Sequence, residues 1–574
     1  MSHPWFLHHI SDDPYVFPVG PNRLKIRLQT PNGLGLACSV AYSDRYEPPG
    51  RETPVPMEKL GSAGPYEIHE AIIETSNRRC RYVFYAEDAS GRYAWYGERG
   101  ISENRDLAGS FQMPYLHRDT AIELPVWTEG TVAYQIFPAS YCQDGLSGIT
   151  ATLPYLKELG INLLYMTPIF ASPSVHKYDT TDYYKIDEAF GTLDDLRLLV
   201  QTAHEHGIRV ILDAVFNHSG DTFFAFKDVL DQGEKSPYRD WFHIHSFPVV
   251  QSPVPSYETF GVAEAYMPKL NLEHPEAADY MIEVAKYWIK ETGIDGWRID
   301  VANEVSPLFW NRLRSEIKGL NPELLLIGEI MHASGFWLKG DRFDGVMNYV
   351  LRDALLSFFA EQTLGPAGFA EQLLHVEALY NDSANLANFQ LIGSHDTERF
   401  LTACSRGRGW DREATAVKRM KLAVFFQMTY LGIPMIYYGD EVGMEGRTDP
   451  DCRRPMIWDT ERQSADMLAW YRQLISIRKN RKALTGGRFR VWFTDEPRNV
   501  IGYVRQSGQE RVRLLINNSP NAYTLDVSPF SETGQPMTEV LSNRRIEGGE
   551  NLRISIGPFE CLILEEEAAR ETGR

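Results

Sequence analysis

Cysteine is scarce in this sequence. The 574 residues contain six cysteines, at positions 38, 80, 142, 404, 452 and 561, and no two of them form a C-x-x-C pair. In a chain of this length, that spacing argues against a disulfide framework and against a cysteine-rich zinc site. We therefore expect free thiols, most of them buried.

Long hydrophobic runs are also lacking. The most apolar stretch, residues 422–438, is interrupted by Gln427, Thr429 and Pro434, so it predicts a buried helix followed by a buried strand. The N-terminal segment MSHPWFLHHISDDPY has neither the basic start nor the apolar centre of a signal peptide. These features predict a cytoplasmic protein with no membrane partner.

Positive charge is in deficit. Lys and Arg number 58 and Asp and Glu number 77, which gives a formal net charge of −19. This balance disfavours nucleic acid and anionic membranes as partners, because both bind basic surfaces. The sequence has no Walker loop, G-x-G-x-x-G, G-x-S-x-G or H-E-x-x-H motif. The composition therefore favours a soluble protein with a neutral ligand.

Three regions differ in their pattern. Residues 1–122 consist of short alternating runs such as LKIRLQT, separated by turn residues, and predict a β-sandwich. Residues 485–574 return to strand-like runs without helices and predict a second β-sandwich. Between them, residues 123–484 alternate between apolar strand-like runs and helical patterns, as the helix at 152–160 illustrates.

The middle region contains eight strand-like runs. They are residues 131–137, 161–166, 208–216, 296–300, 324–330, 343–349, 388–393 and 433–440. Eight strands alternating with helices predict a (β/α)8 TIM barrel. Residues 217–274 follow the third strand with little regular pattern, and we interpret them as an inserted lobe, since a loop of this length is usually functional.

Charged residues gather where these predicted strands end, which is where a barrel of this class places its active site. Strand 3 ends in Asp213, Asn217 and His218, strand 4 in Arg298 and Asp300, strand 5 in Glu329, and strand 7 is followed by His395 and Asp396. Arg298 and Asp300 are two residues apart, so they share one face of their strand.

One such carboxylate is commonly a helix cap, but four at one end of a barrel need another explanation. Two reaction classes use such a cluster: metal-dependent hydrolysis, and glycoside hydrolysis with two carboxyl groups that flank the bond. The absence of a compact metal-ligand motif favours the second.

Four segments resemble the short conserved regions of the α-amylase family of glycoside hydrolases. They are DAVFNH (213–218), GWRIDVANE (296–304), GEI (328–330) and GSHDTER (393–399), in the family's order. MPKLN (267–271), VANE and TPIFASPSVHKYDTTDYYKID (167–187) are similar to the branch of cyclomaltodextrinases, neopullulanases and maltogenic amylases. That branch also has an extra N-terminal β-sandwich, and its members are typically intracellular.

The resemblance implies a role for each matching residue. Asp300 would be the nucleophile, Glu329 the general acid and base, and Asp396 would grip sugar hydroxyls in the transition state. Arg298 would keep Asp300 ionised, while Asp213 and Asn217 would belong to the supporting network. His218 and His395 would hydrogen-bond the sugar, Tyr178 would stack on it, and Glu304 would help to bind the acceptor side.

The resemblance also implies retaining cleavage of α-1,4 bonds, with α-1,6 cleavage and transglycosylation as further activities, in cyclic or short malto-oligosaccharides and pullulan. A homodimer is typical of this branch. No cofactor is expected. Calcium stays open as an alternative, but residues 137–150, where many relatives bind it, contain a single acid, Asp144, so the family's site is not expected here. Two alternatives stay open. One is an α-glucosidase or oligo-1,6-glucosidase acting at chain ends, and the other is an inactive glucan-binding protein.

Overall fold

The structure is a computed structural model of the 574-residue chain. It describes residues 5–48, 50–75, 79–113, 123–262, 264–406, 412–526, 536–547 and 552–566. The predicted boundary at residue 122 and the tail after residue 566 lie outside these ranges. Two compact units are present: residues 1–123 with 333–340 and 367–385, and the remaining residues 124–332, 341–366 and 386–574.

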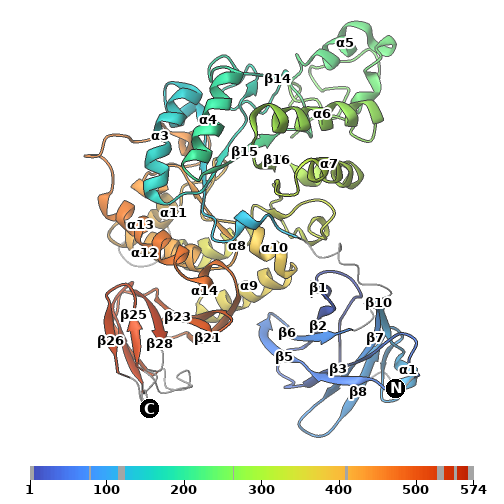
Figure 1. Ribbon diagram of the computed structural model, residues 1–574, viewed down its shortest axis with the longest axis vertical. Helices are drawn as coiled ribbons and strands as arrows, with labels where there is room; N and C mark the ends of the chain where they lie inside the picture. The colour runs from blue at the N-terminus through green and yellow to red at the C-terminus, as the bar shows by residue number, and fades with distance from the viewer. Residues whose placement is uncertain are drawn as a thin grey trace. The chain divides into compact units, whose positions relative to one another are not determined.

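The first unit contains two antiparallel sheets (Figure 1). One has the order β1 (Val16–Gly20), β2 (Arg23–Pro31), β6 (Tyr66–Glu74), β5 (Glu58–Ala63). The other has the order β4 (Thr53–Pro56), β3 (Ala37–Ser43), β7 (Cys80–Glu87), β8 (Tyr93–Gly97), β9 (Gly100–Ser102), and β10 (Phe111–Met113) pairs with β7. Leu24, Ile26 and Leu28 alternate along β2 and are fully buried in the core of this unit.

The opposite face of β2 is buried as well, although its residues are charged. Lys25 Nζ lies 2.7 Å from Asp382 Oδ2, and Arg27 Nη1 donates to the carbonyl of Tyr380 at 2.9 Å. Both partners belong to the segment 367–385, which is far away in the sequence. That segment therefore belongs to the N-terminal unit by its contacts, although the pattern of the sequence groups it with the barrel helices.

The second unit is built on the predicted (β/α)8 barrel, which the structure confirms (Figure 1). Its parallel sheet has the order β18-β17-β16-β15-β12-β11-β20-β19, and a parallel bridge between Met347 and Phe389 joins the two end strands. The eight strands are β11 (Ala133–Ile136), β12 (Leu163–Met166), β15 (Arg209–Ala214), β16 (Gly296–Ile299), β17 (Leu325–Gly328), β18 (Gly345–Val346), β19 (Phe389–Leu391) and β20 (Ile433–Tyr437). Each lies inside one of the eight predicted runs.

Helices follow the strands along the chain. They include α3 (Gly145–Leu159), α4 (Leu193–Glu205), α6 (Pro275–Thr292), α7 (Pro307–Leu320), α8 (Tyr349–Leu355), α12 (Arg412–Thr429) and α13 (Ala465–Lys479). The apolar stretch 422–438 forms the end of α12 and then β20, as predicted. In the described part of the chain, no helix is both long and apolar enough to span a membrane.

Two inserted segments separate strands and helices of the barrel. A hairpin of β13 (Phe170–Ala171) and β14 (Asp182–Ile186) frames the loop that contains Tyr178. The lobe after β15 contains α5 (Phe224–Gln232) and returns through a bridge between His218 and Lys269. This bridge brings the MPKLN segment back to the end of β15.

The C-terminal part of the second unit is a β-sandwich (Figure 1). Its larger sheet has the order β21 (Arg488–Asp495), β22 (Val500–Ser507), β23 (Glu510–Asn517), β28 (Cys561–Glu566), β25 (Met537–Glu539), β26 (Arg544–Ile546). The smaller sheet pairs β24 (Tyr523–Asp526) with β27 (Arg553–Ile556). All six cysteines are free thiols, and only Cys142 is partly exposed.

Candidate active site

Strand register brings the charged residues together at one end of the barrel. Asp213 on β15 is directly opposite Arg298 on β16, and Ile299 of β16 is opposite Gly328 of β17. Asp300 and Glu329 are the next residues after Ile299 and Gly328. Since all three strands are parallel, their carboxylates emerge side by side at the carboxyl ends of the strands.

Arg298 is the centre of this cluster and is completely buried. Its Nη1 donates to Asp213 Oδ1 at 2.8 Å and to Asp300 Oδ1 at 2.9 Å. Its Nη2 forms an ion pair with Glu329 Oε1 at 2.7 Å. One guanidinium therefore contacts three carboxylates, and the two carboxyls predicted to react are held at either side of it.

The charge balance predicts that this cluster binds a proton. Three ionised carboxylates around one guanidinium would leave two uncompensated negative charges in a buried site. Burial raises the pKa of Asp213 to about 6. Burial and the nearby Glu329 raise the pKa of Asp300, and Arg298 opposes this only in part. Arg298 thus lowers the pKa of Asp300, in the direction expected of an adjacent cation, while burial and the second carboxylate raise it by more.

The backbone after Asp300 also contacts Glu329. Val301 has φ +45° and ψ +44°, a left-handed conformation that a β-branched residue rarely adopts. In this conformation its N–H donates to Glu329 Oε2 at 3.1 Å. The strained residue therefore lies between the two carboxylates and fixes the position of one of them.

His395 and Tyr178 form a stacked pair. Their ring centroids are 5.6 Å apart with an interplanar angle of 6°, and Tyr178 Oη lies 2.6 Å from His395 Nε2. Gln135 Nε2 donates to His395 Nδ1 at 2.8 Å, so the ring proton belongs on Nε2. Burial and Arg298 hold the pKa of His395 well below its usual value, which makes it a neutral hydrogen-bonding group.

His218 and Asn217 lie fully buried at the end of β15. The His218 ring stacks on Phe260 of the lobe at 4.7 Å, and burial lowers its pKa to about 3. Asn217 Nδ2 lies 3.2 Å from His218 Nδ1, and the Asn217 carbonyl accepts from Leu270 N–H at 2.9 Å. These contacts connect the strand end to MPKLN.

Glu304 and Asp396 are the more exposed members of the predicted set. The Glu304 side chain is 41% exposed, and its Oε2 lies 3.6 Å from Lys269 Nζ, in the MPKLN segment. The Asp396 side chain is 27% exposed and lies 3.2 Å from His395 Nε2. Arg453 Nη2 donates to Asp396 Oδ1 at 3.0 Å. Asp396 is thus oriented by two groups while it stays open to a ligand.

Three residues of this network are not among those predicted from the sequence. Tyr165 donates to Asp213 Oδ2 at 2.6 Å, Gln135 orients His395, and Arg453 holds Asp396. Gln135 offered a signal, since it is a polar residue inside a fully buried strand, β11. Arg453 offered none, because its contact spans 57 residues of sequence.

Among the described residues, no group of three or more His, Cys, Asp or Glu side chains is arranged to hold a metal ion. Residues 138–141 form the short helix α2, and α3 begins at Gly145, directly after Asp144.

Family descriptions match three successive parts of the chain. Residues 6–117 match "Alpha amylase, N-terminal ig-like domain", residues 135–485 match "Alpha amylase, catalytic domain", and residues 489–563 match "Maltogenic Amylase, C-terminal domain".

Individual relatives match over nearly the whole length. The chain is 41% identical to neopullulanase 2 of Thermoactinomyces vulgaris, over 97% of this chain and 98% of that one. It is 35% identical to the intracellular maltogenic amylase of Bacillus subtilis, over 90% and 91%. A solved cyclomaltodextrinase structure superimposes with a TM-score of 0.91 at 35% identity and covers 98% of this chain and 99% of that one. With a catalytic-domain match over more than half of its length, the chain belongs to the α-amylase family of glycoside hydrolases.

Proposed function

We propose that this enzyme is a retaining glycosidase that opens cyclic α-glucans and cleaves short malto-oligosaccharides and pullulan at α-1,4 bonds, with α-1,6 cleavage and transglycosylation as further activities. One observation carries the proposal: a single buried guanidinium holds two reactive carboxyls on its two nitrogens. Retaining enzymes need carboxyls about 5–5.5 Å apart, without the extra room that an inverting enzyme leaves for water.

Asp300 is the nucleophile in this proposal. Arg298 holds its Oδ1, so we expect Oδ2 to attack the anomeric carbon and form the glycosyl-enzyme. Glu329 donates its proton to the leaving glycosidic oxygen and then takes one from the incoming water or sugar hydroxyl. The N–H of Val301 keeps the Glu329 carboxyl in place between these two steps.

The remaining residues position the sugar. The half-buried ring of Tyr178 offers an apolar face to the sugar ring. The buried His395 and His218 offer neutral ring nitrogens to its hydroxyls, and Asp396 offers a carboxylate. Their hydrogen bonds would strengthen as the ring flattens towards the oxocarbenium-like transition state, which is how such contacts raise kcat. On the acceptor side, we propose that Glu304 and its neighbour Lys269 receive the leaving chain.

The substrate assignment is supported by the names of the relatives, which are neopullulanase, maltogenic amylase and cyclomaltodextrinase. A hydrolysis panel tests it: γ-cyclodextrin, pullulan, soluble starch, maltotriose and isomaltose, with products resolved over time. We expect rapid ring opening to maltose and glucose, slow attack on starch, and no turnover by Asp300→Asn. Cleavage of isomaltose or terminal glucose alone would make the enzyme an exo-glucosidase, and inactivity on all five would refute the proposal.

We further propose a cytoplasmic homodimer that needs no metal cofactor. Six free cysteines, five of them buried, suit a reducing compartment. One of the relatives is named intracellular. Sedimentation at micromolar concentration tests the dimer, and a mass near 65.5 kDa, that of one chain, would refute it.

A further inference from the structure

The guanidinium of Arg298 has a further partner, and it is not a carboxylate. Nε of Arg298 donates to Sδ of Met347 at 3.4 Å, and both side chains are completely buried. Nη1 and Nη2 bind the three carboxylates, so the thioether is the partner of the remaining nitrogen. The two residues are 49 positions apart, and their contact therefore exists only in the folded barrel.

The backbone of Met347 is held on both sides. Its N–H donates to the carbonyl of Gly328 at 3.0 Å, and Gly328 directly precedes Glu329. On the other side, Met347 forms the parallel bridge with Phe389 that joins the two end strands of the barrel. One residue thus connects the guanidinium of Arg298 to the strand that carries Glu329.

A thioether meets two requirements at this position. The side chain of Met347 belongs to the apolar core cluster of the barrel, where a charged group would be costly to bury. Arg298 Nε is a buried donor, however, and a purely aliphatic neighbour would leave it without an acceptor. Sulfur packs as an apolar atom and still accepts a weak hydrogen bond. It also adds no negative charge to a site in which three carboxylates already outnumber one cation.

We propose that Met347 is a positioning residue of the reaction, whose sulfur fixes the plane of the Arg298 guanidinium. Nε, Nη1 and Nη2 lie in one rigid plane. Rotation about the Cδ–Nε bond would swing the Nε–H away from the sulfur and would also move the two Nη groups away from Asp300 and Glu329. The inference rests on the proposed function for the roles of these two carboxyls.

Two substitutions test the sulfur, with γ-cyclodextrin hydrolysis as the activity. Met347→Leu nearly conserves volume but removes the acceptor, so kcat/KM should fall about fivefold, mainly through kcat. Met347→Gln restores a neutral acceptor, so its kcat/KM should lie closer to that of the wild type, although its amide should lower the melting temperature. The Gln variant should therefore be the less stable but the more active of the two. A packing role alone would rank activity and stability in the same order.

The acid limb of kcat/KM is a readout that packing alone would not move. The nucleophile is faced by Arg298, Glu329 and Asp213, and of these Arg298 alone lowers its pKa. A guanidinium that is held less firmly lowers this pKa by less. The acid limb should therefore move to higher pH in Met347→Leu and return towards its wild-type place in Met347→Gln.

Met435→Leu is the matched control. Met435 lies on β20, is completely buried and belongs to the same core cluster. Among the residues that the structure describes, its sulfur has no hydrogen-bond partner. Met435→Leu should therefore match Met347→Leu in melting temperature while it keeps the kcat/KM and the acid limb of the wild type.

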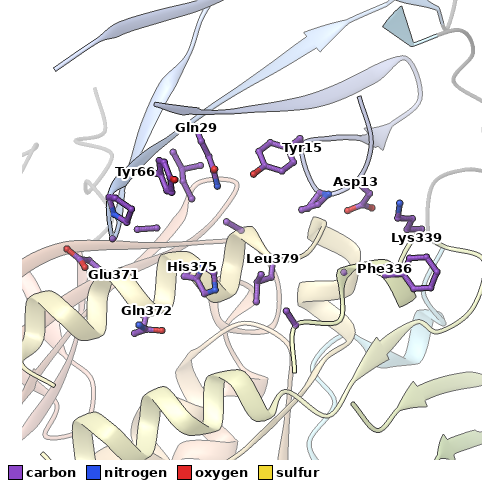
Figure 2. A pocket seen from close by; sticks show the side chains of 18 residues that line it. Asp13, Tyr15, Gln29, Tyr66, Phe336, Lys339, Glu371, Gln372, His375 and Leu379 are labelled. Atoms are coloured by element: carbon purple, nitrogen blue, oxygen red, sulfur yellow. The ribbon is translucent and has the colours of Figure 1, made fainter. Parts of the chain in front are cut away.

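Leu379→Ala controls for loss of stability elsewhere. Leu379 lines a cavity of about 830 Å³ within the N-terminal unit, between strands of the sandwich and α9 (Pro366–Ala378) (Figure 2). None of the residues that line this cavity belongs to the candidate active site. Its truncation should lower the melting temperature without a change in kcat/KM.

Equal kcat/KM and equal acid limbs in Met347→Leu and Met435→Leu would overturn the proposal. Crystal structures of the two Met347 variants test the geometry without any substrate. The guanidinium should lose Asp300 or Glu329 in Met347→Leu and keep both in Met347→Gln, and an unmoved guanidinium in Met347→Leu would also overturn the proposal. Inactivity of the wild type on every glucan would refute the proposed function and leave the crystallographic result standing.

Discussion

At the scale of single residues, Arg298 should matter most. Arg298→Met leaves three buried carboxylates without their cation, and breaking such a network costs about 3–5 kcal/mol of stability. We also expect kcat/KM to fall by about 10³-fold or more, because Asp300 would then take up the proton that Glu329 must donate. Thermal melts and steady-state kinetics measure the two effects. Arg298→Lys keeps the charge but loses the planar guanidinium, so its stability and kcat/KM should lie between those of the wild type and Arg298→Met. Wild-type kinetics in Arg298→Met would contradict this role of Arg298.

The pH dependence of the same cluster gives a second prediction. The nucleophile must be ionised, so kcat/KM should fall as pH drops through the raised pKa of the carboxylate cluster, in which burial raises the pKa of Asp213 to about 6. The charge of Asp213 raises the pKa of Asp300. Asp213→Asn should therefore move the acid limb of the kcat/KM profile to lower pH. An acid limb that stays in place or rises would show that Asp213 does not act through charge.

Two buried carboxyls should stabilise the folded state when they are protonated. This is the opposite of the usual effect of acid, which removes the charge of paired carboxylates and destabilises the folded state. Burial raises the pKa of Asp213 and Asp440 in the folded state to about 6, above the ordinary value of 3.8. The folded state therefore binds more protons than the unfolded state between these values, and this contribution to stability is lost as pH rises from about 4 to about 6. Urea titrations should show that Asp440→Asn flattens the loss of stability across that window. An unchanged slope would contradict the assignment.

At the scale of elements, one lysine ties the loop between β13 and β14 to both of its ends. Lys177 has φ +66°, and its Nζ contacts the carbonyl of Ser172 at 2.9 Å and Asp187 Oδ2 at 2.8 Å. Lys177→Met should loosen Tyr178 and lower kcat/KM about tenfold, chiefly through KM, and it should also lower the melting temperature because Asp187 loses its cation. Lys185→Met, which removes an exposed ion pair with Glu188 in the same hairpin, is the matched control and should behave as wild type.

Elements also show what the sequence could predict. The eight barrel strands were recognisable because buried parallel strands form continuous apolar runs, and the site because those runs end in carboxylates. The grouping of residues 367–385 with the N-terminal unit could not be recognised in the sequence. It depends on tertiary contacts such as that of Arg27 with Tyr380, which are 353 residues apart. Arg453 was not predictable for the same reason, because its role comes from a tertiary contact with Asp396. Gln135 was marked as unusual by its place in a buried strand, but its partner His395 was not predictable from local periodicity.

At the scale of the whole molecule, the last prediction concerns metals. The resemblance to the α-amylase family implies that a calcium site would lie after the first barrel strand, where this chain has a single acid, Asp144, next to the helices α2 and α3. Calcium sites need six to eight oxygen ligands, and one carboxylate supplies at most two of them. We therefore expect prolonged treatment with EDTA to leave both the melting temperature and the rate of γ-cyclodextrin hydrolysis unchanged. If the enzyme lost activity and recovered it with Ca²⁺ but not with Mg²⁺, the oxygen ligands would have to come from elsewhere in the chain. Asp144→Asn would then distinguish the two cases, because it should weaken Ca²⁺ recovery only if this segment forms the site.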